Sequence, residues 1–425
     1  MTPDADWKTL DGSPRVISKL RSRVIVTVIA TVMGLGVVEG YLRLADVQPG
    51  VLALFLPPAG SARSYRLKPN LNLAVPVETT TISIKTNSHG MRWREVDLLK
   101  PAGMTRVAFV GDSFAFGQWS DSAEHSLVGT FDSRMRTRGF DVLNFGVPGY
   151  GFLEVEEQLE TDVKAFQPDY IVLLSFNGND FADTYMGFDR YEVGSSGLLR
   201  SNADHRARTI PAEFMPKQSS HPGPLESIYL YNVLQRARRN MFSPPPPPDS
   251  GFPPRRPAFE TDNTISAFFW SRKAYPPFAE QARKVSIEAL ERIAKLCEIN
   301  GARLIIITIP TLQQIYFADA FPESHDVCRP QKYVEEFAST RQIPYLDLLP
   351  PLAEHYRRTG ANLHFQHEGH FNNEGHRVTG ELIADSFKEL ISGRLSGVPG
   401  ADESCLATSV LRPLSRTRTV ANAHG

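Results

Sequence analysis

The sequence predicts an α/β protein built on a parallel sheet that carries helices on both faces. Short apolar runs typical of buried strands lie at 105–110, 140–145, 170–176, 302–309 and 343–348. Segments with apolar residues at three- and four-residue intervals, typical of amphipathic helices, lie at 126–138, 153–166, 278–299 and 374–391. Strands that alternate with helices in this way form a parallel sheet, whose sites lie where loops follow the carboxyl ends of the strands.

The composition is that of a folded protein without a polyanionic partner. Of the 425 residues, 41% are hydrophobic and 22% are charged, which is the usual globular balance. The formal net charge is -1, so the overall charge gives no reason to expect nucleic-acid binding. We expect no nucleic-acid partner.

The three cysteines, Cys297, Cys328 and Cys405, are too few and too scattered for a disulfide framework. One bridge is possible, and Cys297 is expected to be a small buried hydrophobe on a helix. No CxxC or HExxH pattern occurs, so we expect neither a metal ion nor a cofactor, although the histidines between 364 and 376 leave a metal site as the alternative.

The amino-terminal segment has the features of a membrane anchor. Residues 24–38 carry no charge and follow Arg15, Lys19, Arg21 and Arg23, a basic flank of the kind that stays in the cytoplasm. Continuing to Ala45 gives the roughly 20 residues that a spanning helix needs. We expect an uncleaved, single-pass signal anchor at 24–45, with residues 1–23 in the cytoplasm and the rest of the chain outside it. A cleaved signal peptide and a buried helix are the alternatives.

The remainder divides into a small lead-in, a main domain and a tail. Residues 46–100 are rich in β-branched residues and predict a small β element that ends in a turn at Ser88-His89-Gly90. The main domain spans 101–393 and contains a proline-rich insertion at about 187–276, with five consecutive prolines at 244–248. That run favours extended geometry, and a ligand for proline-binding modules is the alternative to a surface loop. The tail, 394–425, is expected to be disordered.

Three predicted strands end in residues that can carry chemistry. Ser113 follows the first strand in the sequence GDSF, where its hydroxyl can act as a nucleophile or simply cap the next helix. Gly149, in GVPGYG after the second strand, can present a backbone amide to a developing oxyanion. Asn179, in NGND after the third strand, can donate from its side chain or form an Asx turn.

A histidine-rich segment before the last predicted helix supplies candidate bases. It reads HEGHFNNEGH from 367 to 376. An imidazole titrates near neutrality, at about 6.5, so one of these side chains can take the proton of a serine hydroxyl. A nearby carboxylate would fix its tautomer and stabilise the imidazolium.

Together these four blocks resemble the SGNH (GDSL-type) hydrolase superfamily. The resemblance implies a flavodoxin-like three-layer α/β/α sandwich with Ser113 as nucleophile and His370 as base. It also implies an oxyanion hole formed by Ser113, Gly149 and Asn179. The NSHGMR stretch at 87–92 is similar to the lead-in of bacterial membrane-linked members, which would place the domain on the periplasmic or extracellular side of a bacterial inner membrane.

The sequence departs from the family pattern at two positions. Asn177 stands where the third block usually has glycine. The family's acid is an aspartate three or two residues before the base, whereas this chain has His367 and Glu368 there. We expect Glu368 to complete the triad, with a Ser-His dyad as the alternative. His376 is the competing base, but its place within the last helix favours a packing role.

These residues predict a serine esterase or O-acyltransferase that acts on an acyl group, expected to be acetyl, ester-linked to a carbohydrate. The membrane helix and the acylated carbohydrate are the expected partners. Two alternatives stay open, a lipid or broad-specificity carboxylesterase and a catalytically silent module that binds acylated glycan.

Overall fold

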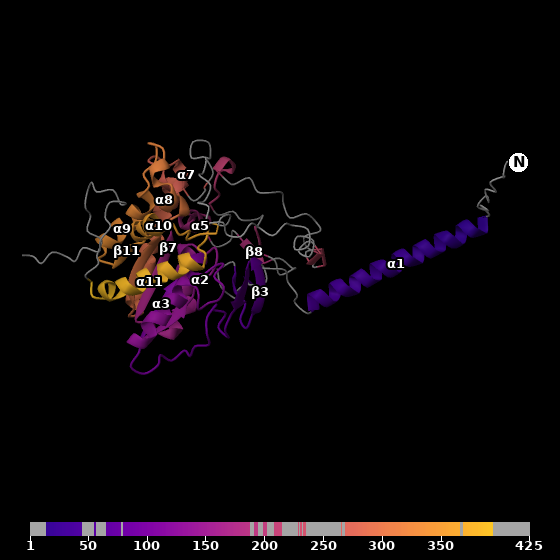
Figure 1. Ribbon diagram of the computed structural model, residues 1–425, viewed down its shortest axis with the longest axis horizontal. Coiled ribbons are helices and arrows are strands. Elements are labelled where there is room, and N and C mark those ends of the chain that lie inside the picture. Colours follow the sequence, from indigo (N-terminus) through magenta and orange to yellow (C-terminus); the bar gives the residue numbers. More distant parts are fainter. Residues whose placement is uncertain are drawn as a thin grey trace, which may run out of the picture. The chain divides into compact units, whose positions relative to one another are not determined.

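The computed structural model describes residues 14–44, 55–56, 65–77, 80–187, 191–193, 199–201, 208–214, 228, 230–231, 233–234, 265, 268–365 and 369–393. By contacts the chain forms two units, residues 1–52 with 220–244 and residues 53–219 with 245–425. Figure 1 shows their secondary-structure elements coloured along the sequence.

A five-stranded parallel sheet forms the centre of the second unit, and the predicted α/β fold class is confirmed. Its order is β11-β10-β7-β5-β6. The strands are β5 (Thr105–Val110), β6 (Phe140–Asn144), β7 (Tyr170–Phe176), β10 (Arg303–Ile309) and β11 (Tyr345–Asp347). The chain runs from β5 to β6 on one side, then crosses to β7 on the other side, so β5 lies at the point where the order reverses. A crevice opens at the carboxyl end of such a strand.

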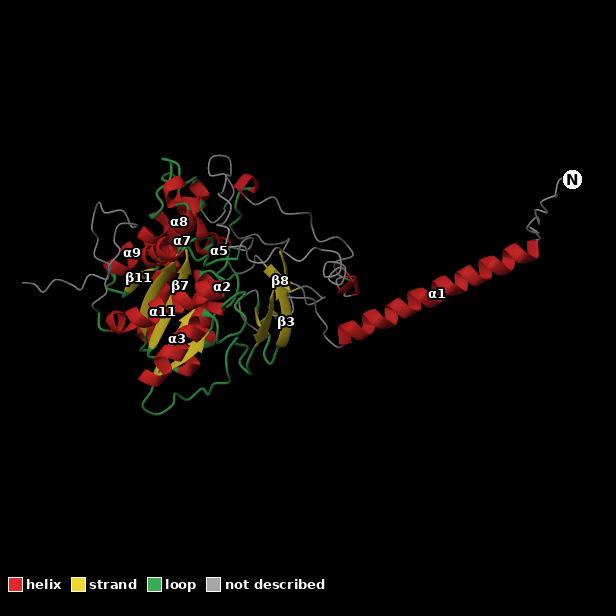
Figure 2. Cartoon of the chain, in the orientation of Figure 1, coloured by secondary structure: helices red, strands yellow, loops and turns green. Residues whose placement is uncertain are grey.

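Helices cover the sheet in two layers, as the strand order and right-handed crossovers require. Helices α3 (Leu127–Met135) and α11 (Asn373–Ile391) pack against each other across one face (Figures 1 and 2). Helices α4 (Phe152–Thr161), α5 (Asp180–Met186) and α7 (Pro277–Ile299) pack together and form the second layer. They belong to connections that cross the sheet in the opposite direction from the connection between β5 and β6. Other helices of the second unit are α2 (Ser113–Phe116), α8 (Leu312–Tyr316), α9 (Arg329–Thr340) and α10 (Leu349–Thr359).

The lead-in contains two small antiparallel pairs. Strand β1 (Phe55–Leu56) pairs with β2 (Arg66–Leu67), and β3 (Asn72–Val77) pairs with β4 (Thr80–Lys85). The predicted turn follows β4, where the Asn87 side chain accepts hydrogen bonds from the amides of His89 and Met91, both at 3.0 Å. A third pair, β8 (Tyr191–Val193) with β9 (Leu199–Ser201), lies within the insertion. The proline run and the tail after residue 393 lie outside the described residues.

The lead-in is tied to the sheet domain by a buried arginine. Arg92 is 1% exposed, and its guanidinium donates to the carbonyl oxygens of Gly117, Ser83 and Ser120. Burial lowers the pKa of Arg92 to about 10, so the side chain stays charged at neutral pH. Gly117 ends the short helix that begins at Ser113, so this arginine links the lead-in to the helix of the candidate nucleophile.

Helix α1 (Pro14–Leu44) forms the amino-terminal part of the first unit. Its stretch Arg21–Leu44 has 24 residues and is apolar enough to cross a membrane, a property that signal sequences share. At 1.5 Å per residue this stretch is about 36 Å long, which exceeds the roughly 30 Å hydrocarbon core of a bilayer. Arg43 and Glu39, near its end, form an ion pair at 2.7 Å.

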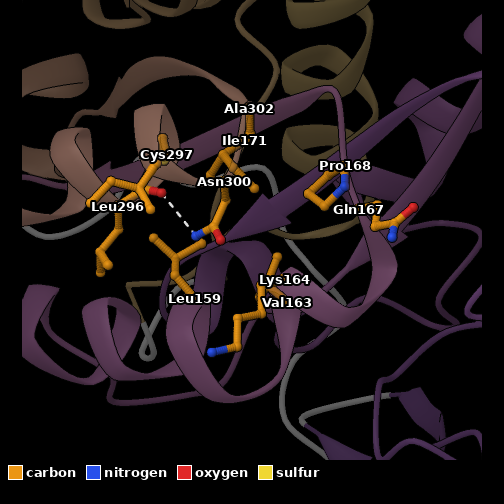
Figure 3. Close-up of a pocket in the computed structure, with 11 residues that line it drawn as sticks. Leu159, Val163, Lys164, Gln167, Pro168, Ile171, Leu296, Cys297, Asn300 and Ala302 are labelled. Atoms are coloured by element: carbon orange, nitrogen blue, oxygen red, sulfur yellow. Dashed lines mark hydrogen bonds between the residues drawn. The ribbon is translucent and has the colours of Figure 1, made fainter.

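A cavity of about 370 Å³ lies at the amino ends of the strands, between α4 and α7 (Figure 3). Its wall combines apolar side chains, among them Leu159 and Ile171, with polar ones such as Lys164, and it includes the buried thiol of Cys297. Asn300 closes one side by donating to the Leu296 carbonyl oxygen at 2.8 Å. The candidate residues lie at the other edge of the sheet, so this cavity is separate from their site.

Candidate active site

The structure brings Ser113 and His370 together at the carboxyl end of β5. The Ser113 Oγ atom lies 2.9 Å from His370 Nε2, although 257 positions separate the two residues in the chain. Ser113 is 6% exposed and is the first residue of α2. This is hydrogen-bond distance for proton transfer from a hydroxyl to an imidazole.

Asp112 places the serine at the start of α2. Its carboxylate accepts a hydrogen bond from the Phe114 amide at 2.9 Å and one from the Ser113 hydroxyl at 3.3 Å. The bond from the Phe114 amide caps the first turn of α2. The cap that the sequence suggested for Ser113 is therefore provided by the residue before it. The Ser113 hydroxyl has one hydrogen, which it can give to Asp112 or to His370.

Phe114 connects this helix with the histidine segment. Its ring lies 5.3 Å from the His370 ring, 5.0 Å from Phe371 and 4.4 Å from Phe176 at the end of β7. The His370 carbonyl oxygen accepts from the Phe365 amide at 2.9 Å. These contacts hold the His370 ring over the end of the sheet.

The other described histidines of this segment are buried away from the serine. His364 bonds through Nδ1 to the Tyr316 hydroxyl at 2.9 Å, and His376 bonds through Nε2 to the Gln118 carbonyl oxygen at 3.1 Å. Burial lowers the pKa of each to about 3, so both stay neutral. Of the histidines that the structure describes between 364 and 376, His370 is the one bonded to Ser113. His367 and Glu368 lie outside the described residues.

Gly149 lies in the loop after β6, and this loop approaches α2 through Gly146. The Val147 amide donates to the Gly111 carbonyl oxygen at 3.0 Å, which joins this loop to the one that carries Ser113. Gly149 has a φ of +80°, a conformation that glycine adopts without strain.

Asn179 follows β7 and is the residue before α5, but its side chain makes no capping bond to the helix amides. Its side-chain nitrogen donates to Asp183 Oδ2 at 2.7 Å. A carboxamide nitrogen carries two hydrogens, so one remains for a second acceptor. Because β6 and β7 flank β5, the loops that carry Gly149 and Asn179 both adjoin the loop of Ser113.

Asn177, which replaces the usual glycine, belongs to a buried amide cluster. Its side-chain nitrogen donates to Gln331 Oε1 at 3.1 Å and to Gln314 Oε1 at 3.4 Å, and Gln314 donates to Gln331 at 2.9 Å. Its φ is not positive, so the backbone does not require glycine here. Glycine is favoured at the next position, Gly178, for a steric reason, since an added Cβ would lie 2.4 Å from the Phe176 ring.

Buried carboxylates lie beneath the site. Asp112 and Asp180 are 1% and 3% exposed, and Asp180 Oδ2 accepts from the Phe176 amide at 2.8 Å. Burial raises the pKa of Asp112 to about 7, and burial together with the charges of Asp112 and Asp183 raises the pKa of Asp180. This cluster could not be predicted from the sequence, because the raised pKa values come from burial, which no local sequence pattern shows.

A parallel α/β sheet with a serine-histidine pair at the carboxyl ends of its strands is an arrangement used by enzymes that act through a serine nucleophile. Residues 109–269 match the model of the GDSL-like Lipase/Acylhydrolase family, so the chain carries a GDSL-like lipase/acylhydrolase domain. The match includes Ser113, Gly149 and Asn179, whereas His370 lies beyond it. The predicted resemblance to GDSL-type hydrolases is thereby confirmed.

Several solved structures are similar to the chain. One is a two-domain esterase active on acetylated mannans, with 10% identity and a TM-score of 0.36, covering 68% of this chain and 51% of that one. Another is an acetyl xylan esterase, with 11% identity and a TM-score of 0.35, covering 66% and 98%. A third is a catalytic mutant of an acetylxylan esterase from Geobacillus stearothermophilus, with 12% identity and a TM-score of 0.37, covering 68% and 95%. A search of curated proteins finds no match.

Proposed function

We propose that the protein is a serine esterase or O-acyltransferase that works through an acyl-enzyme on Ser113. His370 takes the proton of the serine hydroxyl as the oxygen attacks an ester carbonyl, and then gives it to the departing alcohol. The observation that carries this proposal is the 2.9 Å distance between Ser113 Oγ and His370 Nε2.

The negative oxygen of the tetrahedral intermediate needs donors that are already in place. The amides of Ser113 and Gly149 and the side chain of Asn179 supply them, since their loops follow three adjacent strands. The bond from Asn179 to Asp183 fixes the plane of the carboxamide before substrate arrives. Losing one such donor typically lowers the rate by about 10²–10³.

Glu368 is proposed as the third member of the triad, with the role of orienting His370. It precedes the histidine by two residues, and a glutamate carboxylate has the reach for this contact. A Glu368→Gln variant is the test: a triad acid predicts a large loss of kcat, whereas a dyad predicts nearly wild-type kcat.

The proposed substrate is a carbohydrate that carries ester-linked acetyl groups. The acyl group passes from Ser113 either to water or to a sugar hydroxyl, and the same enzyme chemistry serves both acceptors. A membrane-anchored domain outside the cytoplasm meets cell-envelope and exported polysaccharides, which supports this class over lipid esters.

We propose a bacterial inner-membrane protein with its enzyme domain on the periplasmic or extracellular side, and two observations support the anchor and the location of the domain outside the cytoplasm. Helix α1 has the length and composition to span a membrane, and basic residues precede its apolar stretch. Cys328 is disulfide-bonded, and disulfides persist mainly in oxidising compartments outside the cytoplasm. A periplasm-specific reporter fused after residue 60 should be active; activity of a cytoplasm-specific reporter there would contradict this orientation.

Hydrolysis of an aryl acetate by the full-length protein tests the proposed activity. Ser113→Ala should abolish turnover, while Ser133→Ala should leave it unchanged because Ser133 is an exposed serine on α3. Acetate release from an acetylated xylan or mannan then tests the substrate class. Wild-type protein that turns over no acetyl ester would contradict the enzyme assignment in favour of a glycan-binding module.

A further inference from the structure

The loop that carries the proposed oxyanion donor is a tight turn over residues 147–150. The Tyr150 amide donates to the Val147 carbonyl oxygen at 3.2 Å and closes the turn. Pro148 is its second residue, and Gly149, with a φ of +80°, is its third. These are the features of a type II turn.

The orientation of one peptide plane distinguishes this turn from its alternative. Type I and type II turns differ mainly in a flip of the central peptide, here the bond between Pro148 and Gly149. That peptide contains both the Pro148 carbonyl and the Gly149 N–H. The described chain has no cis peptide bond, so the two groups of this planar unit point in opposite directions. A group that fixes the direction of the Pro148 carbonyl therefore also fixes the direction of the Gly149 N–H.

Tyr65, in the lead-in, holds this carbonyl. Its hydroxyl donates to the Pro148 carbonyl oxygen at 2.8 Å. The Tyr150 hydroxyl donates in turn to the Tyr65 carbonyl oxygen at 2.7 Å, and the two rings lie 5.5 Å apart. Tyr65 is 3% exposed and Tyr150 is 1% exposed, so both hydroxyls donate from buried side chains; the bond to Tyr65 is buried and the bond to Pro148 is partly buried.

Tyr65 is itself held in a fixed position. Its ring packs edge-on against Phe55 at 4.9 Å, and it directly precedes β2, which pairs with β1. A hydroxyl on so fixed a ring can select one of the two peptide orientations. A hydrogen bond to the carbonyl also polarises the amide, which makes its N–H a stronger donor.

We propose that Tyr65 is a positioning residue of the ester-cleaving reaction, which holds the Pro148–Gly149 peptide so that the Gly149 N–H faces the developing oxyanion. This inference rests on the proposed function of Ser113 and Gly149. It gives the lead-in a part in the reaction, although residues 55–95 lie outside the segment that matches the family model.

The test is steady-state hydrolysis of an aryl acetate by the full chain with Tyr65→Phe, which removes the hydroxyl and keeps the ring. We expect kcat to fall about tenfold with KM within about twofold, because the donor acts on charge that develops in the transition state. Tyr150→Phe is the matched control, since it removes a hydroxyl from the same buried pair without touching the Pro148–Gly149 peptide. Its kcat should stay within about threefold of wild type.

A double-mutant cycle separates positioning from general stability. Gly149→Ala keeps the backbone N–H but disfavours the φ of +80° and so disturbs the turn that aims it. If Tyr65 acts through the Gly149 amide, Tyr65→Phe should cost much less in this background than in wild type. Thermal unfolding of every variant identifies losses caused by misfolding, and rates are normalised to the fraction of folded protein. Additive effects, or equal losses in Tyr65→Phe and Tyr150→Phe, would overturn the inference while leaving Ser113 reactive. An unreactive wild-type protein would instead overturn the proposed function on which it rests.

Discussion

Replacing Asn177 with glycine restores the family's usual residue and removes a buried amide beside the end of β7. Asn177 is 6% exposed, and its bond to Gln331 at 3.1 Å has normal length, whereas its contact with Gln314 at 3.4 Å is long and weak. Gln331 keeps the bond from Gln314, so its oxygen is not left without a donor. The lost bond should therefore cost only about 1 kcal/mol.

The added backbone freedom of glycine should cost about another 0.5–1 kcal/mol relative to alanine. The free energy of unfolding should thus fall by about 2 kcal/mol in Asn177→Gly and by about 1 kcal/mol in Asn177→Ala. Urea denaturation followed by tryptophan fluorescence measures both values. The kcat for an aryl acetate should stay within about threefold of wild type, because the Asn177 side chain bonds away from Ser113. Unchanged stability in both variants, or a lost kcat at unchanged stability, would refute this account of the substitution.

Three further predictions concern buried polar groups. Because Asp112 has its pKa raised to about 7 by burial, the folded state holds a proton that the unfolded chain releases near pH 4, so the free energy of unfolding should fall as pH rises from about 4 to about 7. Urea titrations should show a shallower fall for Asp112→Asn, and an unchanged slope would count against the raised pKa. His376→Gln should lower the melting temperature yet keep the kcat of the folded fraction. His370→Gln should instead lose kcat and keep the melting temperature. Loss of kcat in both variants would contradict the assignment of His370 as the base. Arg92→Lys cannot keep all the hydrogen bonds of the guanidinium fork, so it should destabilise the protein by about 2–3 kcal/mol in denaturant titration. Wild-type stability would show that the link between lead-in and sheet is dispensable.

Much of the fold was predictable from the sequence because the central strands are buried on both faces. A short apolar run such as 170–176 is typical of a strand buried on both faces, and β7 has the same bounds as this run. The helix predicted at 278–299 differs from α7 by one residue at its start, where Pro277 occupies the first turn. Helices α2, α5 and α8 were not predicted, because each has only four to seven residues and is too short for a periodic pattern. Helices α9 and α10 were missed although both are amphipathic, so their pattern could have been found in the sequence.

The approach of Ser113 to His370 followed from the order of the blocks, since loops at one edge of a parallel sheet converge. The features that support the site could not be read in the same way. Asn177 was identified as a departure from the family, but its amide partners come from α8 and α9, which no local pattern connects with it. Tyr65 bonds to a backbone carbonyl 83 positions away, and a bond of that kind leaves no motif in a single sequence.

The central claim is that Ser113 becomes a nucleophile because His370 removes its proton. Wild-type full-length protein, treated with a fluorophosphonate and digested, should show by mass spectrometry one modified peptide that carries the adduct on Ser113. The rate of modification should fall by at least about 10³ in His370→Gln, and it should stay near that of wild type in His376→Gln. An adduct on another serine, or modification of Ser113 that is equally fast without the His370 imidazole, would contradict the account.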